Sequence, residues 1–144
     1  MPKSGTDIAG AGAPGNASSE PGSPMKVLVV ESVAPVRETL AAALRFCGFV
    51  VFTANTAEEA LGLARDNGEI QVIVTSQQLL SKSGTQLARD VQQLNRPVST
   101  VLLLEKANGH GIDFQNVAAV LFKPFTMDNL LRGVRLAERQ LNGL

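Results

Sequence analysis

Short apolar runs alternate with amphipathic segments along most of the chain. Five runs rich in β-branched and large apolar residues are predicted to form buried strands, at residues 26–30, 49–53, 71–75, 99–104 and 117–122. Between the runs, apolar residues recur at helical spacing, which predicts a helix after each strand. The sequence therefore predicts an α/β fold, with a five-stranded parallel sheet covered by helices on both faces.

Polar residues mark where several of these helices begin. Thr56, Ser83 and Thr126 stand where an N-cap residue is expected. Thr56 and Ser83 have Glu and Gln, respectively, three positions later, which is the spacing of a capping box. These three positions are therefore predicted as helix starts.

The first helix is predicted to bury one stripe and to end at Gly48. The stripe consists of Val36, Leu40, Leu44 and Cys47. Cys47 is the single cysteine of the chain, so no disulfide and no cysteine zinc site can form within it. We interpret it as a small core residue.

Residues 108–111, Asn-Gly-His-Gly, disfavour a helix where the fourth one is expected. That helix is therefore predicted to be short or irregular. His110 is interpreted as an exposed loop residue, because a metal site needs more ligands than one histidine.

The first 24 residues are dominated by Gly, Ala, Pro and Ser, which predicts a disordered tail. The tail is either an inert extension or a segment that orders on a partner. Residues 25–144 are predicted to form one folded domain, which a length of 144 residues and an apolar fraction of 44% can support.

Thirteen basic side chains balance thirteen acidic ones, so no net charge favours binding to nucleic acid or to an anionic membrane. The chain also lacks an apolar run of about 18 residues and an N-terminal signal core. We expect a cytoplasmic protein that binds neither nucleic acid nor membrane.

Candidate chemistry is expected at the carboxyl ends of the strands, because open parallel sheets bind their ligands there. The residues at these positions are Glu31, Ser32, Ser76, Glu105 and Lys123.

The strand ends and their surroundings resemble the receiver domains of two-component response regulators. The resemblance is carried by VLVVES at 27–32, VIVTS at 72–76, VLLLE at 101–105 and LFKPF at 121–125, and by Gly84 eight residues after Ser76. It covers residues 25–144. It implies a (βα)5, flavodoxin-like fold and a phosphorylation cleft at the strand ends.

In receivers, an acidic pair follows the first strand, a phospho-accepting Asp follows the third, a Thr or Ser follows the fourth, and a Lys precedes Pro after the fifth. Lys123 alone matches unchanged. Ser32, Ser76 and Glu105 depart from the pattern, and Val120 replaces the aromatic switch residue. The resemblance thus implies a degenerate receiver.

Phosphotransfer in receivers uses Mg²⁺ held by several carboxylates. Three carboxylates are reduced to Glu31 here, and a serine hydroxyl at Ser76 is a weak nucleophile. We therefore expect no catalytic residue, no bound metal, no cofactor and no enzyme activity. Glu105 is hypothesised to pair with Lys123 and to hold one conformation without a signal.

The last helix carries Arg132, Arg135 and Arg139 at helical spacing. The simplest interpretation is a solvated helix face, and the alternative is an interaction face that includes Phe125. Arginine fits an acidic protein surface or the phosphates of a cyclic dinucleotide.

The sequence therefore favours a stand-alone module of bacterial two-component signalling that works through protein–protein interaction, independently of phosphorylation. The partner is expected to be a histidine kinase or another signalling protein. Two alternatives remain: a flavodoxin-like protein that binds a small ligand or a cyclic dinucleotide, and a switch phosphorylated on Ser76 or Ser32. The oligomeric state stays open.

Overall fold

The computed structural model describes residues 24–108 and 110–142, so the predicted tail, apart from Pro24, lies outside the described residues. The strands are β2 (Lys26–Val30), β3 (Val50–Ala54), β4 (Ile70–Ser76), β5 (Ser99–Glu105) and β6 (Ala119–Lys123). The helices are α1 (Ala34–Phe46), α2 (Ala57–Asp66), α3 (Gly84–Val91), the 3₁₀ turn η1 (Lys106–Asn108) and α4 (Met127–Leu141).

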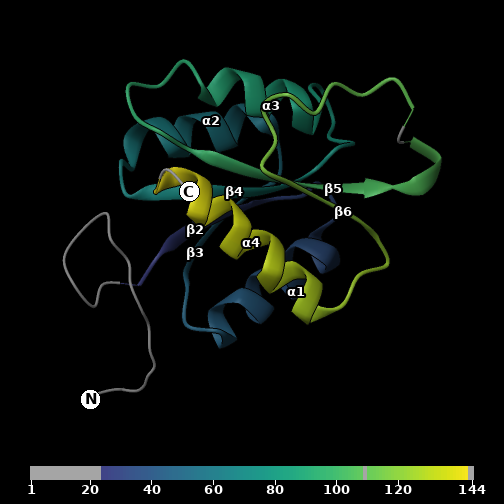
Figure 1. Cartoon of the computed structure of the whole chain (residues 1–144), viewed down its shortest axis with the longest axis horizontal. Helices are drawn as coiled ribbons and strands as arrows, with labels where there is room; N and C mark the ends of the chain where they lie inside the picture. Colours follow the sequence, from purple (N-terminus) through teal and green to yellow (C-terminus); the bar gives the residue numbers. More distant parts are fainter. Residues whose placement is uncertain (1–23, 109, 143–144) are drawn as a thin grey trace.

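The strands form one parallel sheet in the order β3-β2-β4-β5-β6. Helices α2 and α3 cover one face, and α1 and α4 cover the other (Figure 1). The predicted α/β architecture is confirmed. Within the described ranges, no helix is long and apolar enough to cross a membrane.

The apolar run of β2 is continuous because both of its faces are buried. Val27 and Val29 pack in the core beneath α1 and α4, whereas Leu28 and Val30 pack in the core beneath α2 and α3. This two-sided burial is typical of central parallel strands. It also explains why strand periodicity of two is invisible in this segment.

The predicted helix starts are confirmed at Thr56, Ser83 and Thr126, whose side chains each accept a backbone hydrogen bond from the residue three positions later. Full capping boxes form at Ser83 and Thr126. The box predicted at Thr56 is incomplete, because the Glu59 carboxylate accepts from the Asn55 amide at 3.0 Å instead.

Among its described residues, 106–108 and 110–118, the fourth crossover contains no α-helix. The chain leaves β5 through the single 3₁₀ turn η1 and then runs irregularly to β6, as the glycines of this stretch predict. His110 is exposed in this loop. The last strand begins at Ala119 rather than at Val117, because the Val117 amide closes a turn onto the Phe114 carbonyl at 3.1 Å.

The buried stripe of α1 is narrower than predicted and consists of Leu40, Ala41 and Leu44. Val36 is 37% exposed. The interpretation of Cys47 as a core residue is wrong: it is the half-buried C-cap of α1, and its Sγ lies 3.9 Å from Met127 Sδ. The helix itself ends at Phe46, and Gly48 follows the C-cap with a φ of 97°, which confirms this glycine as the predicted stop.

Arg96 links the α3–β5 loop to the end of α2, a contact that the sequence does not predict. Its Nη2 donates to the carbonyls of Ala64, Asn67 and Ile70 at 2.8, 3.0 and 3.0 Å, and its Nε donates to the carbonyl of Gly68 at 2.8 Å. Burial lowers the pKa of this guanidinium. Ala64 lies in the last turn of α2, where carbonyls lack partners within the helix, and Ile70 begins β4, so the arginine connects the end of the helix to the start of the strand.

Candidate functional site

The strand ends of β2, β4, β5 and β6 meet at one edge of the sheet. Strand order reverses between β2 and β4, which is where open parallel sheets place their sites. A cleft of about 360 Å³ opens there. All five predicted strand-end residues line it, namely Glu31, Ser32, Ser76, Glu105 and Lys123.

Glu31 is held rigidly at the bottom of this cleft. Its side chain is only 4% exposed, and its Oε2 accepts from the Val33 amide at 3.0 Å. The Glu31 amide donates to the Ala54 carbonyl at 3.1 Å, and the Glu31 carbonyl accepts from Arg37 Nη1 at 2.8 Å. A buried carboxylate needs such partners to offset the loss of water.

Ser76 and Lys123 complete a network on the other oxygen of Glu31. The buried Ser76 hydroxyl donates to Glu31 Oε1. Lys123 Nζ lies 3.5 Å from the same Oε1 and donates to Ser76 Oγ at 3.3 Å. We call Glu31, Ser76 and Lys123 the cleft network. Its cation, from the end of β6, neutralises the buried charge of Glu31 at the end of β2.

The hypothesised pair between Glu105 and Lys123 is secondary to this network. Glu105 Oε2 lies 4.0 Å from Lys123 Nζ, and its side chain is 56% exposed. An exposed ion pair at this distance is weak because water screens it. Glu31, which is closer and buried, is therefore the main anionic partner of Lys123.

The donor set of the cleft does not fit Mg²⁺. Both oxygens of Glu31 are already engaged, and the ammonium of Lys123 stands beside one of them. Ser76 adds only a neutral hydroxyl, whereas Mg²⁺ in proteins is bound through carboxylates. Among the residues that the structure describes, no three His, Cys, Asp or Glu side chains gather as a metal site.

The predicted interaction face lies apart from the cleft lining. Arg132, Arg135 and Arg139 are exposed on α4, but Phe125 is half-buried and packs against the core beneath α1 and α4. Part of the Phe125 side chain is thus buried against the core, and its place in an interaction face stays a prediction. Val120, at the predicted switch position, is half-buried in β6 opposite Leu102 and does not line the cleft.

An apolar rim borders the cleft, which sequence reasoning missed. Val33 is 52% exposed and Leu80 is 76% exposed, and both line the cleft with the half-buried Leu79. The loop that carries the two leucines is anchored by Gln77, whose side-chain oxygen accepts from the Thr85 amide at 2.9 Å. Periodicity gives no information in such loops, so no sequence signal could have placed these side chains.

Solved receiver domains superpose on this chain along nearly their whole length. The signal receiver domain of an HD domain-containing protein from Pseudomonas fluorescens matches with a TM-score of 0.74 and 22% identity, over 85% of this chain and 100% of that one. A receiver domain from Methylobacillus flagellatus matches with a TM-score of 0.71 and 20% identity, over 78% and 98% of the two chains. A response regulator from Thermotoga maritima, in complex with Mg²⁺ and BeF, matches with a TM-score of 0.70 and 22% identity, over 76% and 96%.

No protein-family model matches the sequence, and no curated protein matches it. At these identities the likeness concerns the fold. It confirms the receiver-type architecture that the strand-end motifs predict. The described part of this chain therefore has the fold of response regulator receiver domains.

Proposed function

We propose that this chain is a receiver-like signalling module that works through protein–protein interaction, independently of phosphorylation and without enzyme activity. The observation that carries this proposal is the cleft network. Ser76 stands at the end of β4, where the resemblance places a phospho-accepting Asp. Its hydroxyl donates a hydrogen bond to Glu31. Lys123, which would contact a phosphoryl group, already has a buried anionic partner at 3.5 Å.

The charge balance of the cleft argues against phosphotransfer. A phosphoryl group on Ser76 would place additional negative charge beside the buried carboxylate of Glu31, with Lys123 as the shared cation. Since the donor set does not fit Mg²⁺, no second cation offsets that repulsion. The related fold from Thermotoga maritima is seen with Mg²⁺ and BeF. We infer that the present cleft binds neither.

The surface around the cleft suits a protein partner. Val33 and Leu80 expose apolar side chains at its rim, and exposed arginines lie along α4. We infer that the partner is a histidine kinase or another signalling protein of a two-component pathway, and that the module works in the cytoplasm.

Phosphotransfer is tested by intact-mass measurement after incubation with Mg²⁺ and acetyl phosphate. We expect no added phosphoryl group on the wild type. The matched control is the double variant Ser32→Asp, Ser76→Asp, which adds two strand-end carboxylates beside Glu31 and should gain one phosphoryl group. A phosphoryl group on wild-type Ser76 would contradict the proposal.

Partner binding is tested by calorimetry against purified cytoplasmic histidine kinase domains from the source organism. We expect one of them to bind with a Kd that changes less than twofold when acetyl phosphate is added. Leu80→Ser should weaken that binding at least tenfold, whereas Phe46→Ser, which changes an exposed apolar residue in the last turn of α1 outside the cleft lining, should leave it unchanged. Binding that requires acetyl phosphate would contradict the proposal.

A further inference from the structure

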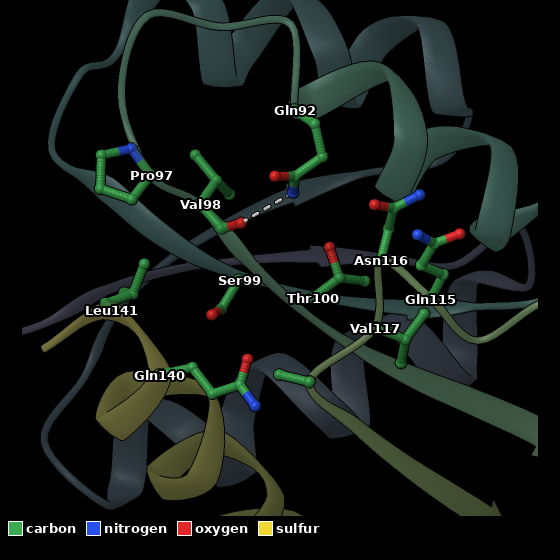
Figure 2. A pocket seen from close by; sticks show the side chains of 11 residues that line it. Gln92, Pro97, Val98, Ser99, Thr100, Gln115, Asn116, Val117, Gln140 and Leu141 are labelled. Atoms are coloured by element: carbon green, nitrogen blue, oxygen red, sulfur yellow. Dashed lines mark hydrogen bonds between the residues drawn. The ribbon is translucent and has the colours of Figure 1, made fainter. Parts of the chain in front are cut away.

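A second pocket lies at the opposite edge of the sheet, beside the amino ends of β5 and β6 (Figure 2). Its volume is about 230 Å³. It is lined by Gln92, Pro97, Val98, Ser99, Thr100, Gln115, Asn116, Val117, Ala118, Gln140 and Leu141. None of these side chains ionises near neutral pH. The pocket is separate from the cleft network, with which it shares no lining residue.

Thr100 gives this pocket a polar atom without a protein partner. The residue is 0% exposed, and its Oγ1 has no hydrogen-bond partner within the described residues. By contrast, the equally buried hydroxyl of Thr75 on the neighbouring strand donates to the Ser76 carbonyl at 2.9 Å. In Figure 2, the Thr100 hydroxyl is directed toward the side of β5 where the amides of Gln92 and Asn116 lie. Such a group costs free energy unless something in the pocket bonds to it.

Side-chain amides from separate elements surround the pocket. Gln92 follows α3, Asn116 and Gln115 precede β6, and Gln140 lies in the last turn of α4. Within the described ranges, the hydrogen bond made by these amides is the one from Gln92 Nε2 to the Val98 carbonyl, at 3.2 Å. The remaining amide groups offer donors and acceptors side by side, without charge.

We propose that this pocket binds a small, uncharged, planar molecule of the nucleobase class. An amide side chain pairs with the adjacent donor and acceptor of a base edge through two hydrogen bonds. Pro97, Val117 and Leu141 supply apolar surface for the faces of a ring. The pocket is smaller than the roughly 300–1,000 Å³ that drug-sized ligands occupy, which fits a molecule of one or two rings.

Among the lining residues that the structure describes, none is a lysine or an arginine, and this narrows the ligand class. Phosphate groups are bound by charge-assisted bonds from such side chains or by free helix N-termini. The lining supplies neither, so the free base or its nucleoside is the expected ligand, rather than a nucleotide.

The proposal is tested by ¹H–¹⁵N NMR, following the side-chain amide signals of Gln115 and Asn116 during titration with adenine, uracil, adenosine monophosphate and glucose. We expect a saturable shift with adenine or uracil, no gain in affinity from the phosphate, and no saturable shift with glucose. Glucose represents an uncharged ligand that is rich in hydroxyls and not planar.

Variants separate a ligand site from a pocket filled with water. Thr100→Val, which removes the hydroxyl and keeps the shape, and Asn116→Leu should each raise the half-saturating concentration of the base at least tenfold. The control Gln93→Leu changes an exposed amide outside the pocket and should leave it within twofold. Absence of saturation with both bases would overturn the proposal. The Thr100 hydroxyl would then be expected to form its hydrogen bond with an ordered water molecule. Tighter binding of glucose than of the bases, or an affinity for the base in Thr100→Val and Asn116→Leu that equals that of the wild type, would also overturn it.

Discussion

Glu31 is a buried carboxylate, and both of its side-chain oxygens have partners. The Val33 amide serves Oε2, and Ser76 and Lys123 serve Oε1. Two other strand-end side chains have less defined surroundings: Ser32 is half-buried and Glu105 is exposed. At the residue scale, the cleft is therefore organised around Glu31, and Glu105 adds little to it.

Replacing Lys123 by Met tests this assignment. The change removes the cation 3.5 Å from Glu31 while keeping a long apolar stem. We expect a loss of about 1–3 kcal/mol in the free energy of unfolding, because a buried charge is left without its counterion. Urea denaturation measures this loss and compares it with Glu105→Gln. For Glu105→Gln we expect the free energy of unfolding to fall by less than about 1 kcal/mol. Equal losses of stability in the two variants would contradict the assignment of Glu31 as the main partner of Lys123.

The carboxylate of Glu58 offers a separate test of a single contact. Hydrogen bonds from the Ser81 hydroxyl, at 2.9 and 2.7 Å, hold the pKa of Glu58 below its ordinary value of 4.5. A lowered pKa in the folded state means that the contact stabilises the protein above the ordinary pKa. That stabilisation disappears as the pH falls through the lowered value.

Ser81→Ala should therefore raise the pKa of Glu58, as measured by carboxyl ¹³C NMR. The wild type should be more stable than the variant at neutral pH, and this difference should vanish in acid. An unchanged pKa in Ser81→Ala would show that Ser81 does not shift the titration of Glu58.

At the scale of elements, Gly84 fixes how α3 packs against the sheet. A Cβ at this position would lie 2.5 Å from the Ser76 carbonyl oxygen and 2.8 Å from Leu102 Cδ1. The close approach of α3 to the end of β4 thus requires the absence of a side chain. The same approach holds the backbone of Ser76, so the glycine also positions the cleft network.

Gly84→Ala is expected to lower the free energy of unfolding by about 1–3 kcal/mol, because backbone must move to admit the methyl group. Gly62→Ala is the matched control, since Gly62 lies inside α2 and a Cβ there meets nothing within 4 Å. That change should stabilise the protein by up to about 1 kcal/mol through helix propensity. Thermal unfolding of both variants measures these changes in stability. If Gly84→Ala stabilised the protein, α3 would have to pack less tightly against the sheet than the structure indicates.

Arg96 connects two loops through four carbonyl groups. Arg96→Met should destabilise the fold by about 1–3 kcal/mol, since the end of α2 loses charge-assisted hydrogen bonds. Arg65→Met, at an exposed position of α2, should change stability by less than about 0.5 kcal/mol. Hydrogen exchange at residues 64–70 should quicken in Arg96→Met alone, and equal protection in the two variants would contradict this role.

At the scale of the whole molecule, the sequence contains the information for the sheet and for the edge that carries the site. Apolar runs such as 26–30 predict buried strands, and the strand-end rule collects Glu31, Ser76 and Lys123 before any coordinates are known. These features depend only on the pattern of apolar residues along the chain and on the topology of the sheet.

Other features depend on side-chain reach and packing, which periodicity does not contain. The choice of Glu31 over Glu105 as the partner of Lys123 is decided by a distance of 3.5 Å against 4.0 Å and by the burial of Glu31. Arg96 meets its carbonyl groups only after two loops have been brought together. The position of Cys47 at a helix end, outside the core, follows from where α1 stops.

The most direct measurement of the central claim is a ¹H–¹⁵N NMR titration of the protein with Mg²⁺ and then with beryllofluoride. The amides of Glu31, Ser76 and Lys123 report on the cleft network, and the double variant Ser32→Asp, Ser76→Asp serves as the responsive control. We predict no saturable shift in the wild type at low millimolar Mg²⁺ or with the phosphoryl mimic, and clear shifts in the double variant. Saturable shifts of the wild-type amides would show that the cleft still binds a phosphoryl group, and would contradict the account.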